Sequence, residues 1–246
     1  MNFQGPVDIT GSATGDYGTV QQHAIGMQAR TRDGRKFRYC YNGAVALVAG
    51  EVIQGPAIVT THLALTPVAA AIGATAVTAT LGGTNNATAN QYAGGYLQVD
   101  TTPGNGRAYA ITGHPAAALS TALTVQLDAS DPIRVALTTG SRVGLIANTY
   151  NGVIEMPVTT ATGKLAGVAV EAIPINNYGW LQTYGDAPVL ITGTPALGAM
   201  MLGVSGTTAG TADIATAAPL IVSQIIGVMR QIGVSGKNNM VFLTID

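Results

Sequence analysis

The chain has 246 residues, of which only 9% are Asp, Glu, Lys or Arg, and its formal net charge is −1. A typical soluble domain carries about 25% charged residues, so we expect this chain either to lie in a membrane or to work packed against neighbouring molecules. The near-zero net charge gives no general attraction to nucleic acid or to acidic membrane surfaces.

The membrane alternative is not favoured by the uncharged stretches. A spanning helix needs about 20 predominantly apolar residues, whereas the uncharged stretch 52–99 consists of small and polar residues and contains Pro56 and Pro67. The first residues show no basic segment followed by an apolar one, so no signal peptide is expected. We therefore predict no membrane association.

The N-terminal residues 1–26 are rich in Gly, Thr, Gln and Asn and show no helical periodicity. We interpret them as an extended arm, either disordered or ordered only on a partner.

A basic cluster follows this arm. Five of the eleven basic residues lie between positions 30 and 38, namely Arg30, Arg32, Arg35, Lys36 and Arg38. Asp33-Gly34 predicts a two-residue hairpin turn, and the alternating residues 36–41 predict a half-buried strand. The cluster is either a solvated pair of strands or an anchor for an acidic protein surface. Nucleic-acid binding is less favoured, because no recognised motif accompanies the charges.

Cys40 lies within this predicted strand, between Tyr39 and Tyr41. A single cysteine cannot form an internal disulfide, so we expect a small buried side chain here.

Short strands separated by turns continue to the end of the chain. The pattern predicts strands at 44–49, 52–53, 57–61, 76–81, 96–99, 108–112, 123–127, 142–146, 168–170, 179–184, 188–192, 225–230 and 240–245. Strands of this length and spacing are typical of all-β sandwiches and barrels. Residues 66–72 and 116–122 are the only helical candidates.

The predicted organisation has three parts. Residues 1–26 form the arm, residues 27–62 and 155–246 form a barrel- or sandwich-type β core, and residues 63–154 form an inserted β domain. The change to Ala- and Thr-rich composition at Leu63 and the turn at Asn151-Gly152 indicate the boundaries. The similar segments 95–98 and 179–182, and 111–116 and 191–196, reflect either chance or two related β-units.

No catalytic or metal-binding pattern is evident. His23, His62 and His114 lie in separate segments without ligand spacing, and Asp128 and Asp131 fit an ordinary turn. We therefore expect no enzymatic activity, cofactor or metal. Trp180 with Tyr178 and Tyr184 fits a sugar-binding platform, but a Trp180 in a barrel core or in an interface is favoured.

Several Gly- and aromatic-rich segments resemble a known family. They are 80–81, 89–97 (Ala-Asn-Gln-Tyr-Ala-Gly-Gly-Tyr-Leu), 104–109, 114–116, 178–183 (Tyr-Gly-Trp-Leu-Gln-Thr), 188–190, 226–228 and 241–246. The chain from about residue 40 onward resembles capsid decoration, or cement, proteins of tailed phages with HK97-type shells.

The resemblance implies a β-rich structural protein, without enzymatic activity, that forms a homotrimer and bridges capsomers. Its partner would be the major capsid protein, and its place the outer surface of the virion after synthesis in the host cytoplasm. The arm and the basic cluster lie outside the resemblance, and their role as the capsid contact is inferred from composition. The alternative is a head-fibre or tail protein that binds host-surface glycan through Tyr92, Tyr96, Trp180 and Tyr184.

Overall fold

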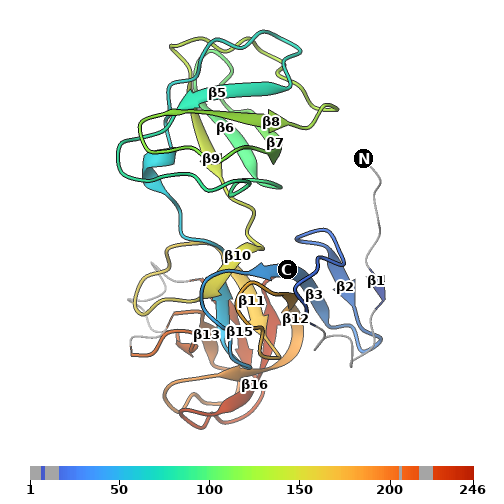
Figure 1. Cartoon of the computed structure of the whole chain (residues 1–246). Helices are drawn as coiled ribbons and strands as arrows, with labels where there is room; N and C mark the ends of the chain where they lie inside the picture. Colours follow the sequence, from blue (N-terminus) through green and yellow to red (C-terminus); the bar gives the residue numbers. More distant parts are fainter. Residues whose placement is uncertain (1–6, 9–16, 205–206, 216–223) are drawn as a thin grey trace. The chain divides into compact units, whose positions relative to one another are not determined.

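The computed structural model describes residues 7–8, 17–204, 207–215 and 224–246 (Figure 1). Its strands are β1 (Val7–Asp8), β2 (Gln28–Arg30), β3 (Lys36–Asn42), β4 (Val52–Gln54), β5 (Ala76–Thr80), β6 (Tyr96–Thr101), β7 (Ala108–Gly113), β8 (Ala122–Leu127), β9 (Arg142–Ile146), β10 (Asn151–Glu155), β11 (Leu165–Ala169), β12 (Tyr178–Leu190), β13 (Met200–Leu202), β14 (Asp213–Ile214), β15 (Ile225–Met229) and β16 (Asn238–Thr244). One 3-10 turn, η2 (Thr60–His62), and no α-helix occur in this described part. The all-β prediction with a barrel- or sandwich-type core is confirmed.

None of the described segments forms a helix that is long and apolar enough to cross a membrane.

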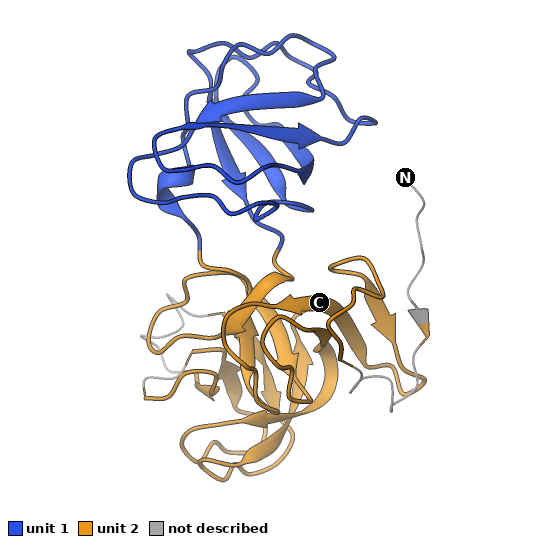
Figure 2. Cartoon of the chain, in the orientation of Figure 1, with its two compact units in different colours: residues 1, 58–148 blue, residues 2–57, 149–246 orange. Residues whose placement is uncertain are grey.

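The chain divides into two compact units (Figure 2). Unit 1 comprises residues 58–148, and unit 2 comprises residues 2–57 and 149–246. The structure divides the chain between residues 57 and 58 and between residues 148 and 149. The boundaries predicted from composition, at 62/63 and 154/155, each lie a few residues after these positions.

Unit 1 is a five-stranded antiparallel sheet in the order β5-β8-β7-β6-β9. Leu65 exchanges backbone hydrogen bonds of 2.7 and 2.9 Å with Val143 of β9, and Val68 donates one of 2.8 Å to Thr78 of β5. The segment 65–68 therefore pairs with both edge strands and covers part of their outer backbone groups. This pairing explains why the helical candidate 66–72 was wrong.

Alternating side chains make the core of unit 1. In β8, Leu123, Val125 and Leu127 are buried, while Thr124 and Gln126 point away from the core. The period of two is the pattern from which the strand was predicted. The other helical candidate, 116–122, is also not helical, because its last residue, Ala122, already pairs with Thr80 of β5.

Unit 2 contains a closed ring of strands. Its sheet runs β3-β10-β4-β11-β12, and β12 pairs back onto β3. Cys40, Ile53, Val153 and Leu181 are fully buried inside this ring. Burial raises the pKa of the Cys40 thiol to about 12, so Cys40 is the small buried side chain that the sequence predicted.

The second half of β12 leads into the rest of the sheet. Residues Tyr178 to Tyr184 pair with β3, and residues Tyr184 to Leu190 pair with β16. From β16 the order continues to β15, β13 and β14. A second group of buried apolar side chains, including Val189, Met201 and Val241, fills the inner side of this part.

The two similar sequence segments occupy different topologies. In unit 1, residues 95–98 lie at the start of β6 and residues 111–116 run from the end of β7 into the segment after it, and these two strands form a hairpin. In unit 2, residues 179–182 lie in β12 and residues 191–196 follow directly after its end. The different placement gives no support to two related β-units.

Two histidines of unit 1 meet around Tyr92, and all three side chains are buried. Nε2 of His62 lies 3.1 Å from the Asn85 carbonyl, which can only accept, so Nε2 donates there, and Nδ1 is hydrogen-bonded to the Tyr92 hydroxyl. Nε2 of His114 accepts the Tyr92 backbone N–H at 3.0 Å, and Nδ1 lies 2.8 Å from the Pro115 carbonyl. His114 is thus the hydrogen-bonding residue at a strand end that the sequence indicated.

Replacing Tyr92 by Phe should lower the free energy of unfolding by about 1–3 kcal/mol, because Nδ1 of His62 is then buried without a partner. Urea unfolding measures the change. Tyr96→Phe is the matched control, since the Tyr96 side chain is 53% exposed, and it should have almost no effect. Equal effects of the two substitutions would contradict this role of the hydroxyl.

Candidate functional site: the basic hairpin

The basic cluster lies on a hairpin formed by β2 and β3, in which Arg30 pairs with Lys36 and Gln28 with Arg38. The predicted hairpin is present, but the two-residue turn was wrong. Gly34 donates to the Thr31 carbonyl and Thr31 to the Arg35 carbonyl, both at 3.0 Å. The loop therefore has three residues, with Gly34 at φ 89° in the left-handed position that such loops require.

One face of β3 is aromatic. Tyr39 pairs with Trp180 and Tyr41 with Tyr178 across β3 and β12, and the Tyr39 and Tyr178 rings stack with centroids 5.9 Å apart. The His23 ring lies 5.1 Å from Tyr39 and 5.3 Å from Trp180. We call these five residues the aromatic cluster.

The end of the predicted arm covers this cluster. The backbone N–H of Gln22 donates to the Tyr39 hydroxyl at 3.0 Å, and Gly18 exchanges backbone hydrogen bonds with Tyr178. Residues 17–26 therefore make contacts within the chain, which differs from an arm that orders only on a partner. The predicted arm residues 1–6 and 9–16 lie outside the described residues.

Three of the five cations have partners within the chain. Arg35 forms an ion pair with Asp33 at 2.8 Å. Arg38 binds the Asp246 carboxylate and donates to the Gly26 carbonyl at 3.0 Å. Nζ of Lys36 lies 3.4 Å from the Asp246 carbonyl and 4.9 Å from the Tyr184 ring centroid.

The other two cations point to solvent. Arg30 and Arg32 are exposed, and neither side chain forms an ion pair with another described residue. The hairpin thus presents two exposed cations beside three that are engaged internally, and Asp8 of β1 lies next to Arg30 in the parallel pairing of β1 with β2.

The carboxylates beside the hairpin respond to these contacts. The hydrogen bond from Arg38 lowers the pKa of Asp246. The hydrogen bond from Thr31 is the main cause that lowers the pKa of Asp33, with a smaller contribution from Arg35. Both groups therefore remain ionised at neutral pH.

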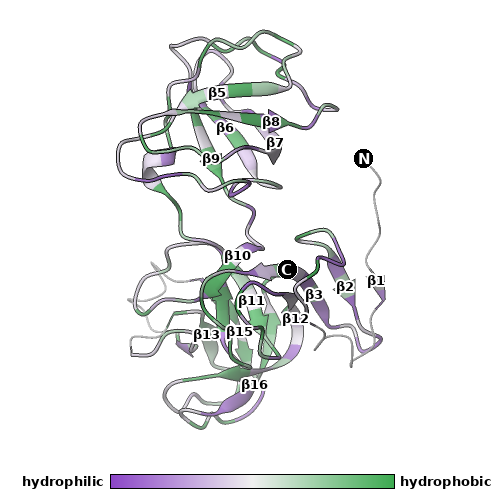
Figure 3. Ribbon diagram, in the orientation of Figure 1, coloured by the Kyte–Doolittle hydropathy of each residue, from purple (hydrophilic) through white to green (hydrophobic). Residues whose placement is uncertain are grey.

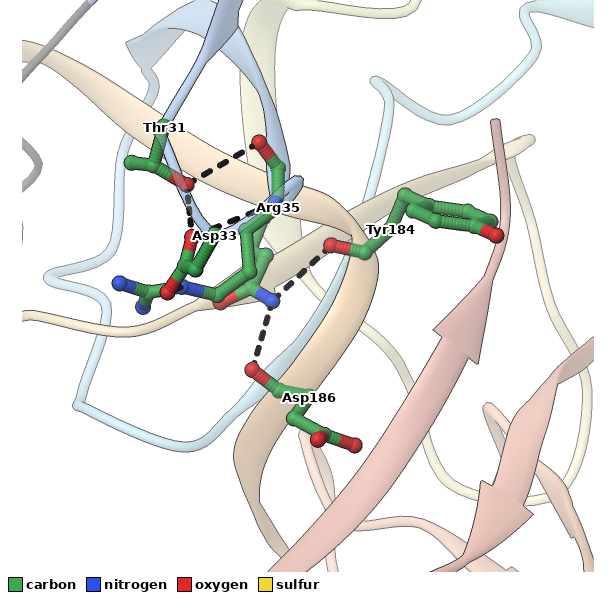
Figure 4. A network of polar contacts seen from close by, with 6 residues as sticks. Thr31, Asp33, Arg35, Tyr184 and Asp186 are labelled. Atoms are coloured by element: carbon green, nitrogen blue, oxygen red, sulfur yellow. Dashed lines mark hydrogen bonds and ion pairs between the residues drawn. The ribbon is translucent and has the colours of Figure 1, made fainter.

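The hairpin loop packs on an irregularity in β12. Gly185 has φ +88°, and a Cβ added there would lie 3.0 Å from Cγ and 3.3 Å from Cα of Arg35. Nε2 of the buried Gln182 donates to the carbonyls of Tyr184 at 3.1 Å and Asp186 at 2.9 Å, which holds the bend (Figure 4). β12 therefore contacts the hairpin at Arg35, the residue that directly follows the loop.

The remaining candidates have structural roles. Asp128 accepts hydrogen bonds from the backbone and side chain of Ser130, and Asp131 pairs with Arg134 at 3.0 Å. No group of three His, Cys, Asp or Glu side chains that could hold a metal ion occurs among the described residues.

Two rings proposed for glycan stacking are buried. Trp180 is 4% exposed and Tyr92 is 2% exposed, whereas Tyr96 is exposed and Tyr184 is half-buried. Of the two interpretations of Trp180, the structure favours the buried cluster.

No family model matches this sequence, and comparisons with curated proteins and with solved structures give no match either. Inferences about function therefore rest on the chain's own residues and on the resemblance of its motifs.

Gly185→Ala should destabilise the protein more than Gly152→Ala. Both glycines have a left-handed φ, +88° and +82°, but nothing lies within 4 Å of a Cβ at Gly152. The Gly152 variant should lose about 1–2 kcal/mol of unfolding free energy from backbone strain alone, and the Gly185 variant should lose more through contact with Arg35. Chemical denaturation measures both, and equal losses would contradict the close packing of the hairpin loop.

The Arg38–Asp246 pair should make stability depend on acid pH. The pKa of Asp246 in the folded protein is lowered from its ordinary value of 3.8. Ionised Asp246 therefore stabilises the fold fully above pH 3.8, and this contribution is lost as the pH falls through the folded-state pKa. Asp246→Asn should be less stable than wild type at pH 7, and the difference in unfolding free energy between the two should become smaller below about pH 4. Arg38→Gln should show the same trend in thermal unfolding; a gap independent of pH for both variants would contradict it.

Proposed function

We propose that this chain is a structural, non-enzymatic virion protein that decorates the outer surface of a tailed-phage capsid. It binds the major capsid protein of an HK97-type shell, bridges capsomers and thereby stabilises the particle. It is made in the host cytoplasm, assembles as a homotrimer and uses no cofactor, nucleic acid or membrane.

The observation that carries the proposal is the pair Arg30 and Arg32, exposed on a hairpin whose loop is packed against β12. In a chain with 9% charged residues, this pair is a localised positive site for an acidic protein surface. A preformed hairpin loses little conformational freedom when it binds. Uncharged surfaces elsewhere can pack on neighbours without desolvating ions.

The glycan-binding alternative has less support. It required four exposed rings, and Tyr92 and Trp180 are buried. Tyr96 and Tyr184 keep exposed surface, but they belong to different units. We therefore retain capsid decoration as the proposed function.

The direct test is cosedimentation of the protein with purified expanded capsids. Arg30→Glu combined with Arg32→Glu should weaken binding by roughly tenfold or more, because reversed charges at an electrostatic contact cost several kcal/mol. The loss should be smaller at high salt.

The control reverses two other exposed cations, Arg107→Glu and Lys237→Glu, so that net charge changes equally. It should bind like wild type. Equal weakening by both double variants would show that net charge acts and not the hairpin, and a wild-type chain that does not bind capsids would overturn the proposed function. Point variants are preferable to deletion of residues 1–38, which would remove the start of β3.

A further inference from the structure

Strands β12, β16, β15 and β13 form one continuous part of the sheet of unit 2. Its inner side is buried: Val189, Val241, Met229 and Met201, one from each strand, are at most 1% exposed. This side faces the core, so the residues between them lie on the opposite side.

The middle of the opposite side is also apolar, between Asn238 and Thr244 at the two ends of β16. The strand register places Met200, Val228 and Phe242 next to one another across β13, β15 and β16. In the next row, Met240 of β16 lies beside Pro188 of β12. Figure 3 colours β15 largely as hydrophobic. We call these five residues the outer face.

The outer face is accessible. Met200 is 43% exposed, Met240 39% and Val228 38%, and Pro188 is exposed. An antiparallel sheet that covers a core with one face normally presents polar residues on the other. A contiguous exposed apolar surface of this kind usually marks an interaction site.

One ion pair lies within this face. Asp186 occupies the position beside Phe242 on β12, and the backbone N–H of Arg230 donates to the Met240 carbonyl at 2.9 Å. Nε of Arg230 lies 3.2 Å from Oδ1 of Asp186, and the two side chains are 56% and 43% exposed. Oδ1 is buried and has no hydrogen-bond partner, so this contact is an ion pair without hydrogen-bond geometry, and the exposed surface of Asp186 belongs to the rest of its side chain.

This charge pattern identifies the kind of partner. One positive and one negative group stand side by side, so the face has no net charge with which to attract an acidic or a basic surface. A second copy of the chain is complementary to this face. Arg230 of each copy can meet Asp186 of the other copy, while the apolar side chains cover one another.

We propose that the outer face is the surface through which copies of this chain bind each other. The inference goes beyond the homotrimer of the proposed function, because one face that meets the same face of a second copy makes a two-fold contact. The contact is apolar at Met200, Val228 and Met240 and is oriented by reciprocal pairing of Arg230 with Asp186.

Sedimentation velocity of the full chain over a concentration series tests the proposal. Wild type should self-associate, and Val228→Asp and Met240→Asp should each raise the dissociation constant by roughly tenfold or more, because each buries an unpaired charge. Val68→Asp is the matched control: this valine is 58% exposed but belongs to unit 1, and its variant should associate like wild type. Circular dichroism verifies that the variants are folded.

A mixing experiment separates contact from folding. Arg230→Glu and Asp186→Lys alone should each weaken self-association, because each places like charges across the contact. An equimolar mixture of the two variants should form mixed oligomers, because the carboxylate introduced in one variant can pair with the ammonium group introduced in the other.

The outcomes also separate this inference from the proposed function. A monomeric wild type, face variants that associate like wild type, or a mixture that stays unassociated would overturn the outer face as the contact. Wild type that self-associates through this face but does not bind capsids would overturn only the proposed function.

Discussion

The hydrogen bonds of Gln182 hold the bend on which the arrangement of unit 2 depends. Its amide joins the carbonyls of Tyr184 and Asp186, and at this point β12 exchanges β3 for β16 as its neighbour. The two neighbours meet at Tyr184, which is paired with both Lys36 and Thr244. The end of β16 is thereby brought to the start of β3, which places Asp246 beside Arg38.

Buried Asn and Gln side chains hold the loops of this protein through hydrogen bonds to backbone groups. The two N–H groups of the fully buried Asn42 are shared among the carbonyls of Val45, Ile173 and Pro174, and Gln54 accepts from the backbone of residues 162 and 163. Asn239 bonds in the same way to residues 234 and 237. Buried amides satisfy loop backbone without the desolvation cost of a charge. The low charge content is therefore compatible with a well-connected interior.

Local patterns predicted most of the strands, because alternation in segments such as 123–127 reports directly which side chains face a core. They also located the basic hairpin and the burial of Cys40. The turn length at Asp33-Gly34 was missed, because the same dipeptide fits two- and three-residue loops. The contacts of the hairpin with Asp246 and Gly185 could not be predicted, because both residues are distant in sequence and only the strand register brings them to the hairpin. The outer face was missed for a similar reason: Val228 and Met240 are unremarkable singly, and become a surface only when β13, β15, β16 and β12 are aligned.

The bend in β12 also connects the two surfaces to which we assign function. Gly185 receives the loop of the basic hairpin, and the next residue, Asp186, presents its carboxylate to the outer face beside Arg230. Both are positioned by the same amide of Gln182. A change at this bend would therefore move the hairpin proposed to bind the capsid and the charge proposed to orient neighbouring copies at the same time. On the capsid surface that we propose, one element that sets both contacts would keep their relative direction the same in every copy.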